Sequence, residues 1–401
     1  MKFIYNLFYG ILLFIGLPFF VFFTRKKGYN AGLKERFVLY KDKPIKNCLW
    51  FHCASVGELN TVYPLIEYYS KEYNLLITVS SPRGKEFAHK KIPFAKIRYL
   101  PFDFSFLIRK FVKIYNPKLL IVAEGEFWYS FITETHNHNP IVSVNTRISP
   151  KTFKTYKKFS FLYKKIFENI DQFLVRSNQD KEFIIQILDN DKKVKVCGDL
   201  KLVSSKVKGD LKFDKNGKKV LIAGSTHYPE EEIIIDTFLE LKKEFPDLAL
   251  IIAPRHLERM DEITDLLKSK NLDYQLRMES EKLEKDIYII NTLGELSKFY
   301  KYADVVFVGG TFAPVGGHNV LEPILENKPV IIGPNYEKIK ELYEEFSKYG
   351  ILKSVKDKNE LKEVIKKFLT EGFSTNIDFD EQQKQIFECY VSNINKFLKN
   401  V

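Results

Sequence analysis

The sequence predicts an α/β protein with two doubly wound, mostly parallel sheets and an apolar helix at its N-terminus. Three observations support this fold class. Short apolar runs alternate with longer amphipathic stretches from about residue 48, as in βαβ units. The alternation restarts after a polar, Lys- and Gly-rich stretch at 204–219, and residues 3–24 contain no charged side chain. The sequence therefore predicts an anchor, two Rossmann-like domains and a terminal helix.

The apolar segment 3–24 is long enough to cross a bilayer, since a helix of that length spans roughly 30 Å. Three cations at 25–27 follow it directly, where a signal peptide would carry a small-residue cleavage site. With one lysine before the segment and three cations after it, the rest of the chain is expected on the cytoplasmic side. Asn6, Gly16 and Pro18 interrupt the run, and a helix lying in the membrane interface is the alternative.

Ten short apolar runs are expected to be buried strands. In the first half they lie at 48–52, 75–79, 119–123, 141–144 and 173–176, and in the second half at 220–223, 248–253, 287–290, 305–308 and 329–332. The expected divisions are an anchor at 1–24, an acceptor domain at 25–205, a donor domain at 206–375, and a helix at 376–401 that packs back across the cleft between the domains.

The composition limits the class of protein. An apolar content of 45% over 401 residues is enough for two ordinary cores and excludes a disordered chain. The net charge of +12 comes from lysines spread over nearly every segment, which fits an anionic membrane or a phosphorylated substrate and argues against a nucleic-acid stripe. The four cysteines form no CxxC pair, and a reducing compartment is the expectation.

A glycine-rich run after the predicted strand 305–308 indicates a binding site. Gly309, Gly310, Gly316 and Gly317 remove side chains where a ligand would approach the backbone, and an apolar helix follows. The expected occupant is an anion, most simply a phosphate. The alternative is a tight turn that needs positive φ angles.

In the first domain, acidic side chains follow two predicted strands. Glu58 opens a helix after a small-residue turn, where it serves either as a general base or as a partner of the helix dipole. Glu124 and Glu126 flank Gly125 at another strand end, and a strand-to-helix turn explains only one of them well. Lys201 lies near the end of this domain, although a lone lysine is usually a solvated surface group.

In the second domain, hydrogen-bond donors suited to a phosphate follow two strands, at 223–227 and 254–256, and a further turn lies at 293–296. We find no Walker P-loop, no GxGxxG and no DxD-like acidic pair, so metal dependence is not expected. His136 and His138 resemble a pair of metal ligands only superficially, and we interpret this segment as a polar loop before Pro140. The pattern suggests a nucleotide-activated donor in the second domain and an acceptor deprotonated by the first.

These residues carry a resemblance that covers almost the whole chain. The segments 52–58 (HCASVGE), 124–128 (EGEFW), 145–149 (NTRIS), 223–227 (AGSTH), 254–256 (PRH) and 309–323 resemble the bacterial 3-deoxy-D-manno-octulosonic acid (Kdo) transferases, which have the GT-B fold. The resemblance implies metal-independent, inverting transfer of Kdo from CMP-Kdo to a lipid A precursor, lipid IVA, with no cofactor. It places this reaction in lipopolysaccharide core biosynthesis at the cytoplasmic face of the inner membrane.

The resemblance also assigns roles to residues. Glu58 matches the catalytic base, and Glu124 and Lys201 match transition-state stabilisers. The CMP contacts carry over to Pro254, Arg255, Leu293, Gly294, Glu295, Asn319, Val320, Leu321 and Glu322. The segment 32–36 resembles an acceptor-side element of the family.

The sequence departs from the family pattern at Tyr129, Ser130 and Leu293, none of which is an acid or a base. Three alternatives were weighed: another GT-B transferase with a different sugar nucleotide, a sugar-nucleotide epimerase on the same fold, and a non-catalytic lipid-binding scaffold. An epimerase has no need of the anchor. A scaffold leaves Glu58, Glu124 and Lys201 without a purpose.

Overall fold

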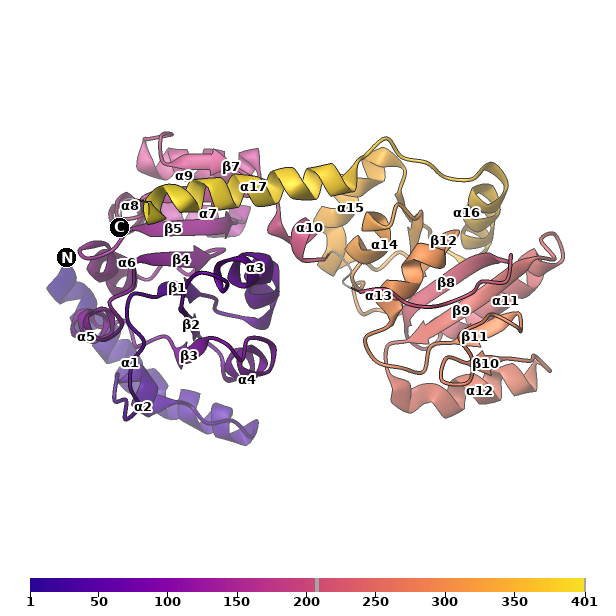
Figure 1. Ribbon diagram of the computed structural model, residues 1–401, viewed down its shortest axis with the longest axis horizontal. Coiled ribbons are helices and arrows are strands. Elements are labelled where there is room, and N and C mark those ends of the chain that lie inside the picture. The colour runs from indigo at the N-terminus through magenta and orange to yellow at the C-terminus, as the bar shows by residue number, and fades with distance from the viewer. Residues whose placement is uncertain (206–208, 400–401) are drawn as a thin grey trace. The chain divides into compact units, whose positions relative to one another are not determined.

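The computed structural model describes residues 1–205 and 209–399, which form two compact units (Figure 1). The first unit comprises Met1–Ser204 and Asp380–Val401, and the second comprises Ser205–Phe379. The predicted boundary between 205 and 206 falls at the edge of residues 206–208, which lie outside the described residues.

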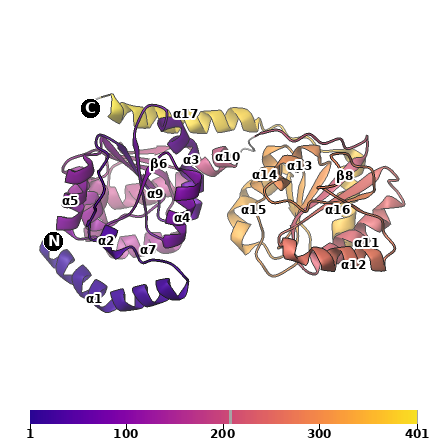
Figure 2. The same ribbon diagram turned by 60° about the horizontal axis from the view of Figure 1, so that its bottom comes forward.

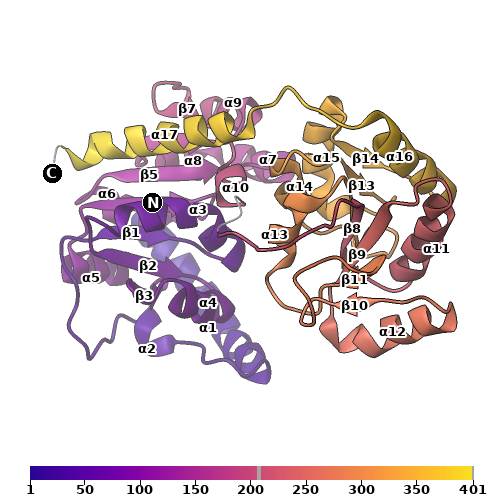
Figure 3. The same ribbon diagram turned by 45° about the vertical axis from the view of Figure 1, so that its right-hand side comes forward.

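The first unit is built on a seven-stranded parallel sheet with strand order β3-β2-β1-β4-β5-β6-β7 (Figure 3). Its strands are β1 (Leu49–His52), β2 (Leu75–Val79), β3 (Lys96–Tyr99), β4 (Leu119–Ala123), β5 (Ile141–Thr146), β6 (Gln172–Val175) and β7 (Val194–Val196). The helices after α1 are α2 (Leu33–Arg36), α3 (Val56–Tyr69), α4 (Pro82–Lys91), α5 (Ser105–Tyr115), α6 (Tyr129–His136), α7 (Pro150–Lys158), α8 (Ser160–Glu168), α9 (Asn178–Leu188) and α10 (Leu200–Ser204).

The second unit repeats this design, with strand order β10-β11-β9-β8-β12-β13-β14. Its strands are β8 (Lys219–Thr226), β9 (Leu248–Pro254), β10 (Gln275–Leu276), β11 (Ile287–Ile289), β12 (Val305–Val308), β13 (Val330–Ile332) and β14 (Leu352–Ser354). Its α-helices are α11 (Glu230–Lys242), α12 (Met260–Ser269), α13 (Leu296–Phe299), α14 (Leu321–Leu325), α15 (Lys340–Phe346) and α16 (Lys358–Glu371). Short 3-10 turns lie at η1 (Leu257–Arg259), η2 (Tyr300–Tyr302), η3 (Glu337–Ile339) and η4 (Ser347–Tyr349).

The central strands are buried along their whole length, because helices cover both faces of each sheet. All ten predicted strands are present, and the doubly wound α/β class is confirmed. The sequence reading missed the short strands β3, β7, β10 and β14. In β3, buried Ile97 and Tyr99 alternate with the cationic Lys96 and Arg98, so this edge strand lacks an apolar run.

Strand order reverses between β1 and β4 in the first unit and between β8 and β12 in the second. In doubly wound sheets the loops at the carboxyl ends of such strand pairs form the ligand crevice. Each unit therefore has one expected site.

Helix α1 (Lys2–Lys26) lies along one side of the first unit (Figure 2). The Tyr5 hydroxyl donates to Asp103 Oδ2 at 2.6 Å, and Asn6 Nδ2 donates to Ser105 Oγ at 2.9 Å. Near the other end Thr24 is buried and the Phe20 ring lies 5.3 Å from the Arg36 guanidinium. The helix is thus attached to the unit at both ends.

The opposite face of α1 is exposed and almost entirely apolar. Its large side chains are Phe3, Ile4, Leu7, Phe8, Ile11, Leu12, Phe14, Ile15, Phe19, Phe22 and Phe23. Among the described residues, α1 is the one helix long and apolar enough to cross a membrane.

Helix α17 (Phe379–Leu398) packs along the first unit (Figures 1 and 3). The Tyr390 hydroxyl donates to the Gly198 carbonyl at 2.8 Å, and a disulfide joins Cys197 to Cys389, with their Cα atoms 5.5 Å apart. The sequence did not predict this pairing. The two residues are 192 positions apart, so their spacing carried no signal.

Candidate active site

The carboxyl ends of β1 and β4 bring the predicted acids of the first unit to one edge of the sheet. These strands are neighbours, with His52 aligned to Val122. Glu58 lies in the first turn of α3, directly beyond β1, and Glu124 follows β4. Both lie at the point where the strand order reverses, which is the expected ligand crevice.

Glu58 is held in a capping box at the start of α3. Its backbone N–H donates to Ser55 Oγ at 3.3 Å, while its carboxylate accepts from the Ala54 N–H at 2.8 Å and from the Ser55 hydroxyl at 3.1 Å. Burial raises the pKa of Glu58 to about 7, and the negative charge of Glu124 acts in the same direction. The side chain therefore caps the helix and also has the pKa of a general base working near neutral pH.

Glu124 occupies a strained position next to a cluster of charges. Its φ angle is 54°, and its N–H donates to the Val144 carbonyl at 2.9 Å. Burial raises the pKa of Glu124, and the positive charge of Lys201 opposes this shift. Lys201 belongs to α10 and its backbone N–H donates to Asp199 Oδ1. The positive charge of Lys201 thus acts on Glu124 in the folded structure.

Glu126, the second acid of the EGE turn, has the opposite ionisation behaviour. Burial acts to raise its pKa, but interactions with His52, Trp128 and Ser80 outweigh this and lower the pKa to about 2. Trp128 Nε1 and the Ser80 hydroxyl donate to its carboxylate at 3.0 and 3.1 Å, and His52 Nε2 lies 3.5 Å away. Glu126 is therefore ionised at neutral pH and holds the Ser80 and Trp128 side chains, a role that the sequence did not predict.

In the second unit, the histidine that follows β8 lies against a histidine of the glycine-rich run. His227 Nε2 lies 2.7 Å from His318 Nε2, and the two rings are stacked. Burial, with contributions from His227 and Arg255, lowers the pKa of His318 to about 4. Arg255 follows β9, and its N–H donates to the Thr226 carbonyl at 3.0 Å. The donor-rich ends of β8 and β9 thus lie together, as predicted.

The other predicted nucleotide contacts differ in accessibility. Leu293 is 84% exposed, and the adjacent Gly294 has a φ of 81°. Glu295 is already paired with Arg277 at 3.3 Å.

Asn319 accepts from the Leu321 N–H and donates to Glu322 at 2.9 Å. The side chains of Pro254, Val320 and Leu321 are buried, so these residues present mainly backbone groups to a ligand.

The glycine-rich run itself is not an open anion cradle. The backbone N–H groups of Gly310, Thr311 and Phe312 donate to the fully buried carboxylate of Glu230, at 2.8–2.9 Å. A Cβ at Gly309 would come within 2.5 Å of the Ser225 carbonyl oxygen. Gly309 is therefore required by the packing of the loop, and these three donors of the run bind Glu230 and not a ligand.

The comparisons with known proteins follow this geometry. The family described as "3-Deoxy-D-manno-octulosonic-acid transferase (kdotransferase)" matches residues 31–204. A 3-deoxy-D-manno-octulosonic acid transferase of Aquifex aeolicus is 32% identical over 367 residues, which is 90% of this chain and 98% of the relative. The chain belongs to the Kdo transferase family.

One further relative and one solved structure are also similar to this chain. A bifunctional glycosyltransferase/methyltransferase of Fusobacterium nucleatum is 34% identical over 402 residues, covering 96% of this chain and 61% of that protein. A UDP-N-acetylglucosamine 2-epimerase structure matches 88% of this chain and 97% of its own, with a TM-score of 0.57 and 13% identity. This likeness concerns the fold alone, and the Kdo transferase has the GT-B architecture expected from its sequence.

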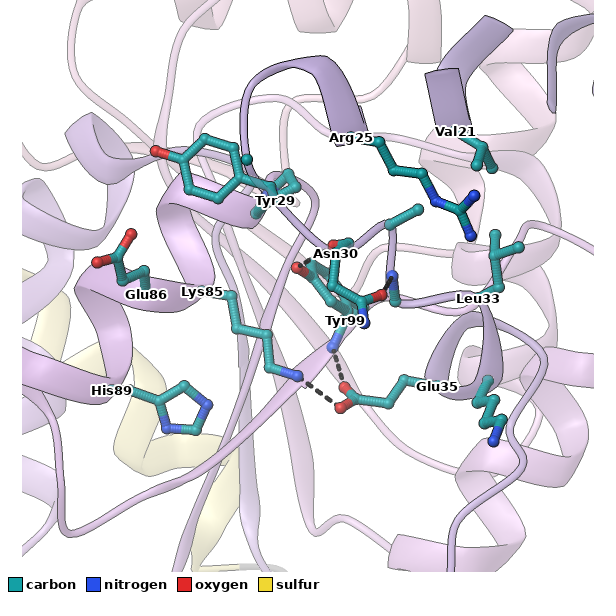
Figure 4. A pocket seen from close by; sticks show the side chains of 15 residues that line it. Val21, Arg25, Tyr29, Asn30, Leu33, Glu35, Lys85, Glu86, His89 and Tyr99 are labelled. Atoms are coloured by element: carbon teal, nitrogen blue, oxygen red, sulfur yellow. Dashed lines mark hydrogen bonds and ion pairs between the residues drawn. The ribbon is translucent and has the colours of Figure 1, made fainter. Parts of the chain in front are cut away.

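Residues 32–35 of this Kdo transferase line a cavity of about 1020 Å³ beside α1 (Figure 4). Glu35 accepts from Lys85 Nζ at 2.5 Å and from the Tyr99 N–H at 3.1 Å. Gly32 has a φ of 68°, and a Cβ there would fall 2.1 Å from the Tyr99 ring. The segment is thus tied to β3 and α4, with Arg25 reaching towards it from the end of α1.

Proposed function

We propose that this Kdo transferase moves Kdo from CMP-Kdo to a hydroxyl of a lipid A precursor, lipid IVA, with inversion and without a metal ion. The observation that carries the proposal is the position of Glu58. It lies at the point where strand order reverses, and its pKa of about 7 suits a base that works at neutral pH. Membership of the family supplies the sugar.

In the proposed step, the Glu58 carboxylate takes the proton of the acceptor hydroxyl. At the same time the oxygen of that hydroxyl bonds to the anomeric carbon of Kdo. The bond from that carbon to the phosphate oxygen breaks, and CMP leaves with the electron pair. Lys201 offsets the negative charge on the departing phosphate or on the donor carboxylate, and Glu124 stabilises positive charge at the anomeric centre. The effect of the Lys201 charge on Glu124 supports a shared role.

The donor side of the proposal rests on the second unit. Arg255 and the accessible turn at Leu293 and Gly294 are the groups we assign to CMP, together with Pro254, Glu295, Asn319, Val320, Leu321 and Glu322. Arg255 offers a charged donor for the phosphate, and Leu293 offers an exposed apolar surface for the base.

We further propose that α1 lies in the membrane plane on the cytoplasmic side of the inner membrane. Its contacts near Tyr5 and near Thr24 attach both ends to the first unit, which a helix leaving the unit to cross the bilayer would not allow. Its outer face exposes Phe14 at 83%, and this face suits the acyl boundary. Of the two alternatives left open by the sequence, the contacts favour the interfacial helix.

The test uses the full chain with CMP-Kdo generated in situ, a tetraacylated lipid A precursor and a chelator. We expect CMP release and an acceptor heavier by one or more Kdo units. Glu58→Gln should reduce transfer by about 10²–10⁴-fold, the usual contribution of a general base. Glu72→Gln is the matched control, because Glu72 is an exposed acid just beyond the same helix. Undiminished transfer by Glu58→Gln would contradict the mechanism.

The same assay separates the alternatives. Another GT-B transferase would release a different nucleotide from a different sugar donor. An epimerase would convert its sugar nucleotide without any acceptor.

A further inference from the structure

A cavity of about 410 Å³, lined mainly by apolar side chains and also by Arg36, Ser80 and Asp103, lies between α1 and the loop that follows β4. Leu13, Gly16 and Leu17 line it from α1, and Phe102 lines it from the body of the unit. Glu126 and Trp128 form part of its polar end. Its size is in the range of small-ligand pockets, and its lining of apolar walls with a few polar groups is typical of them.

The apolar wall of the cavity is continuous with the outer face of α1. Leu13 and Leu17 pack against the core of the first unit, while the neighbouring Leu12, which also lines the cavity, is 54% exposed. A hydrocarbon chain that contacts the exposed face can therefore enter the cavity without leaving apolar surroundings.

Gly16 lines the cavity from α1 and has no side chain. A Cβ built at Gly16 meets no atom within 4 Å, so packing does not require a glycine there. A glycine inside a helix destabilises it by roughly 0.5–1 kcal/mol relative to alanine. The missing side chain leaves free space at the middle of α1, next to the cavity.

The polar end of the cavity is part of the candidate active site. Trp128 is 43% exposed and its indole N–H donates to Glu126, two residues beyond Glu124. An amphiphile with its tail between α1 and Phe102 would therefore have its polar part beside the loop that carries Glu124.

We propose that this cavity binds one acyl chain of the lipid acceptor and that Gly16 is its entrance. The inference rests on the proposed function, since it takes the acceptor to be an acylated lipid. It adds a positioning element: the acyl chain orients the acceptor relative to the loop of Glu124, and the cavity selects acylated over deacylated acceptors.

The direct test is binding of a brominated fatty acid to the full chain. Bromine quenches tryptophan fluorescence at short range. The chain has two tryptophans, and Trp50 is fully buried, so quenching reports Trp128 at the cavity. We expect saturable quenching of the wild type and its loss in Gly16→Phe, which fills the entrance. Ile15→Phe, on the neighbouring exposed position, should quench as the wild type does. Equal quenching of Gly16→Phe and the wild type would overturn the site.

A transfer assay then identifies the source of the chain. Gly16→Phe should raise KM for the tetraacylated acceptor roughly 10-fold or more, with KM for CMP-Kdo and the rate on a deacylated acceptor unchanged. Two results would overturn the assignment to the acceptor. One is an equal loss of activity of Gly16→Phe on the deacylated acceptor, and the other is weaker binding of Gly16→Phe than of Ile15→Phe to vesicles. Failure of the proposed function has a different signature, because the wild type itself would then transfer nothing.

Discussion

At the residue scale, the ionisation of Glu58 should set the pH dependence of transfer. Burial raises the pKa of this carboxyl to about 7, and only its ionised form can accept a proton. We therefore expect kcat/KM to rise about tenfold per pH unit below 7 and to level off above about 8. The measurement is CMP release against pH. The small residual activity of Glu58→Gln should not show this rise of kcat/KM with pH. If the variant still showed the rise, the titrating group would be a residue other than Glu58.

The EGE turn shows which residue properties the sequence could predict. Glu58 and Glu124 were predicted because acids that follow neighbouring parallel strands meet at one sheet edge, whereas Lys201 was assigned only through the family resemblance. All three residues lie in the first unit. The difference between Glu124 and Glu126 was not predictable. It depends on His52, Ser80 and Trp128, which approach Glu126 only after the strands have paired.

At the element scale, the loop after β12 depends on one carboxylate from α11. Glu230 accepts N–H donors from Gly310, Thr311 and Phe312 and from the His227 backbone. Glu230→Gln replaces an acceptor oxygen with a donor and should lower the free energy of unfolding by about 1–3 kcal/mol. The urea midpoint of the second unit measures this loss. Glu232→Gln is the control, since Glu232 is exposed on the same turn of α11 and should change stability by less than about 0.5 kcal/mol. Equal midpoints for the two variants would refute the role of Glu230.

Elements that contain a long apolar run were predicted well. Elements whose conformation depends on contacts with residues distant in the sequence were not. The runs at β2, β4 and β12 predicted their strands because buried parallel strands are apolar throughout. The glycine run after β12 was correctly placed at a strand end, but its donors serve Glu230, 80 residues earlier in the chain. No local pattern encodes such a contact.

At the scale of the whole molecule, each unit has its own hydrophobic core, and the chain passes between the units only after Ser204 and after Phe379. Two repeats of the βα alternation predicted this division, although the return of α17 to the first unit depends on contacts such as Tyr390 to Gly198. Separate cores allow a ligand of one unit to stabilise that unit alone.

This separation gives a test of the donor site that does not depend on the acceptor. CMP at about 100 times its Kd should stabilise the second unit by about 2.7 kcal/mol. Its calorimetric transition should then rise by roughly 5–10 °C. Trp50 and Trp128 both belong to the first unit, so the transition seen by tryptophan fluorescence should not move. Arg255→Ala should abolish the calorimetric shift, and Lys268→Ala, an exposed cation on α12, should retain it. A shift that appears equally in fluorescence, or that survives in Arg255→Ala, would place CMP elsewhere.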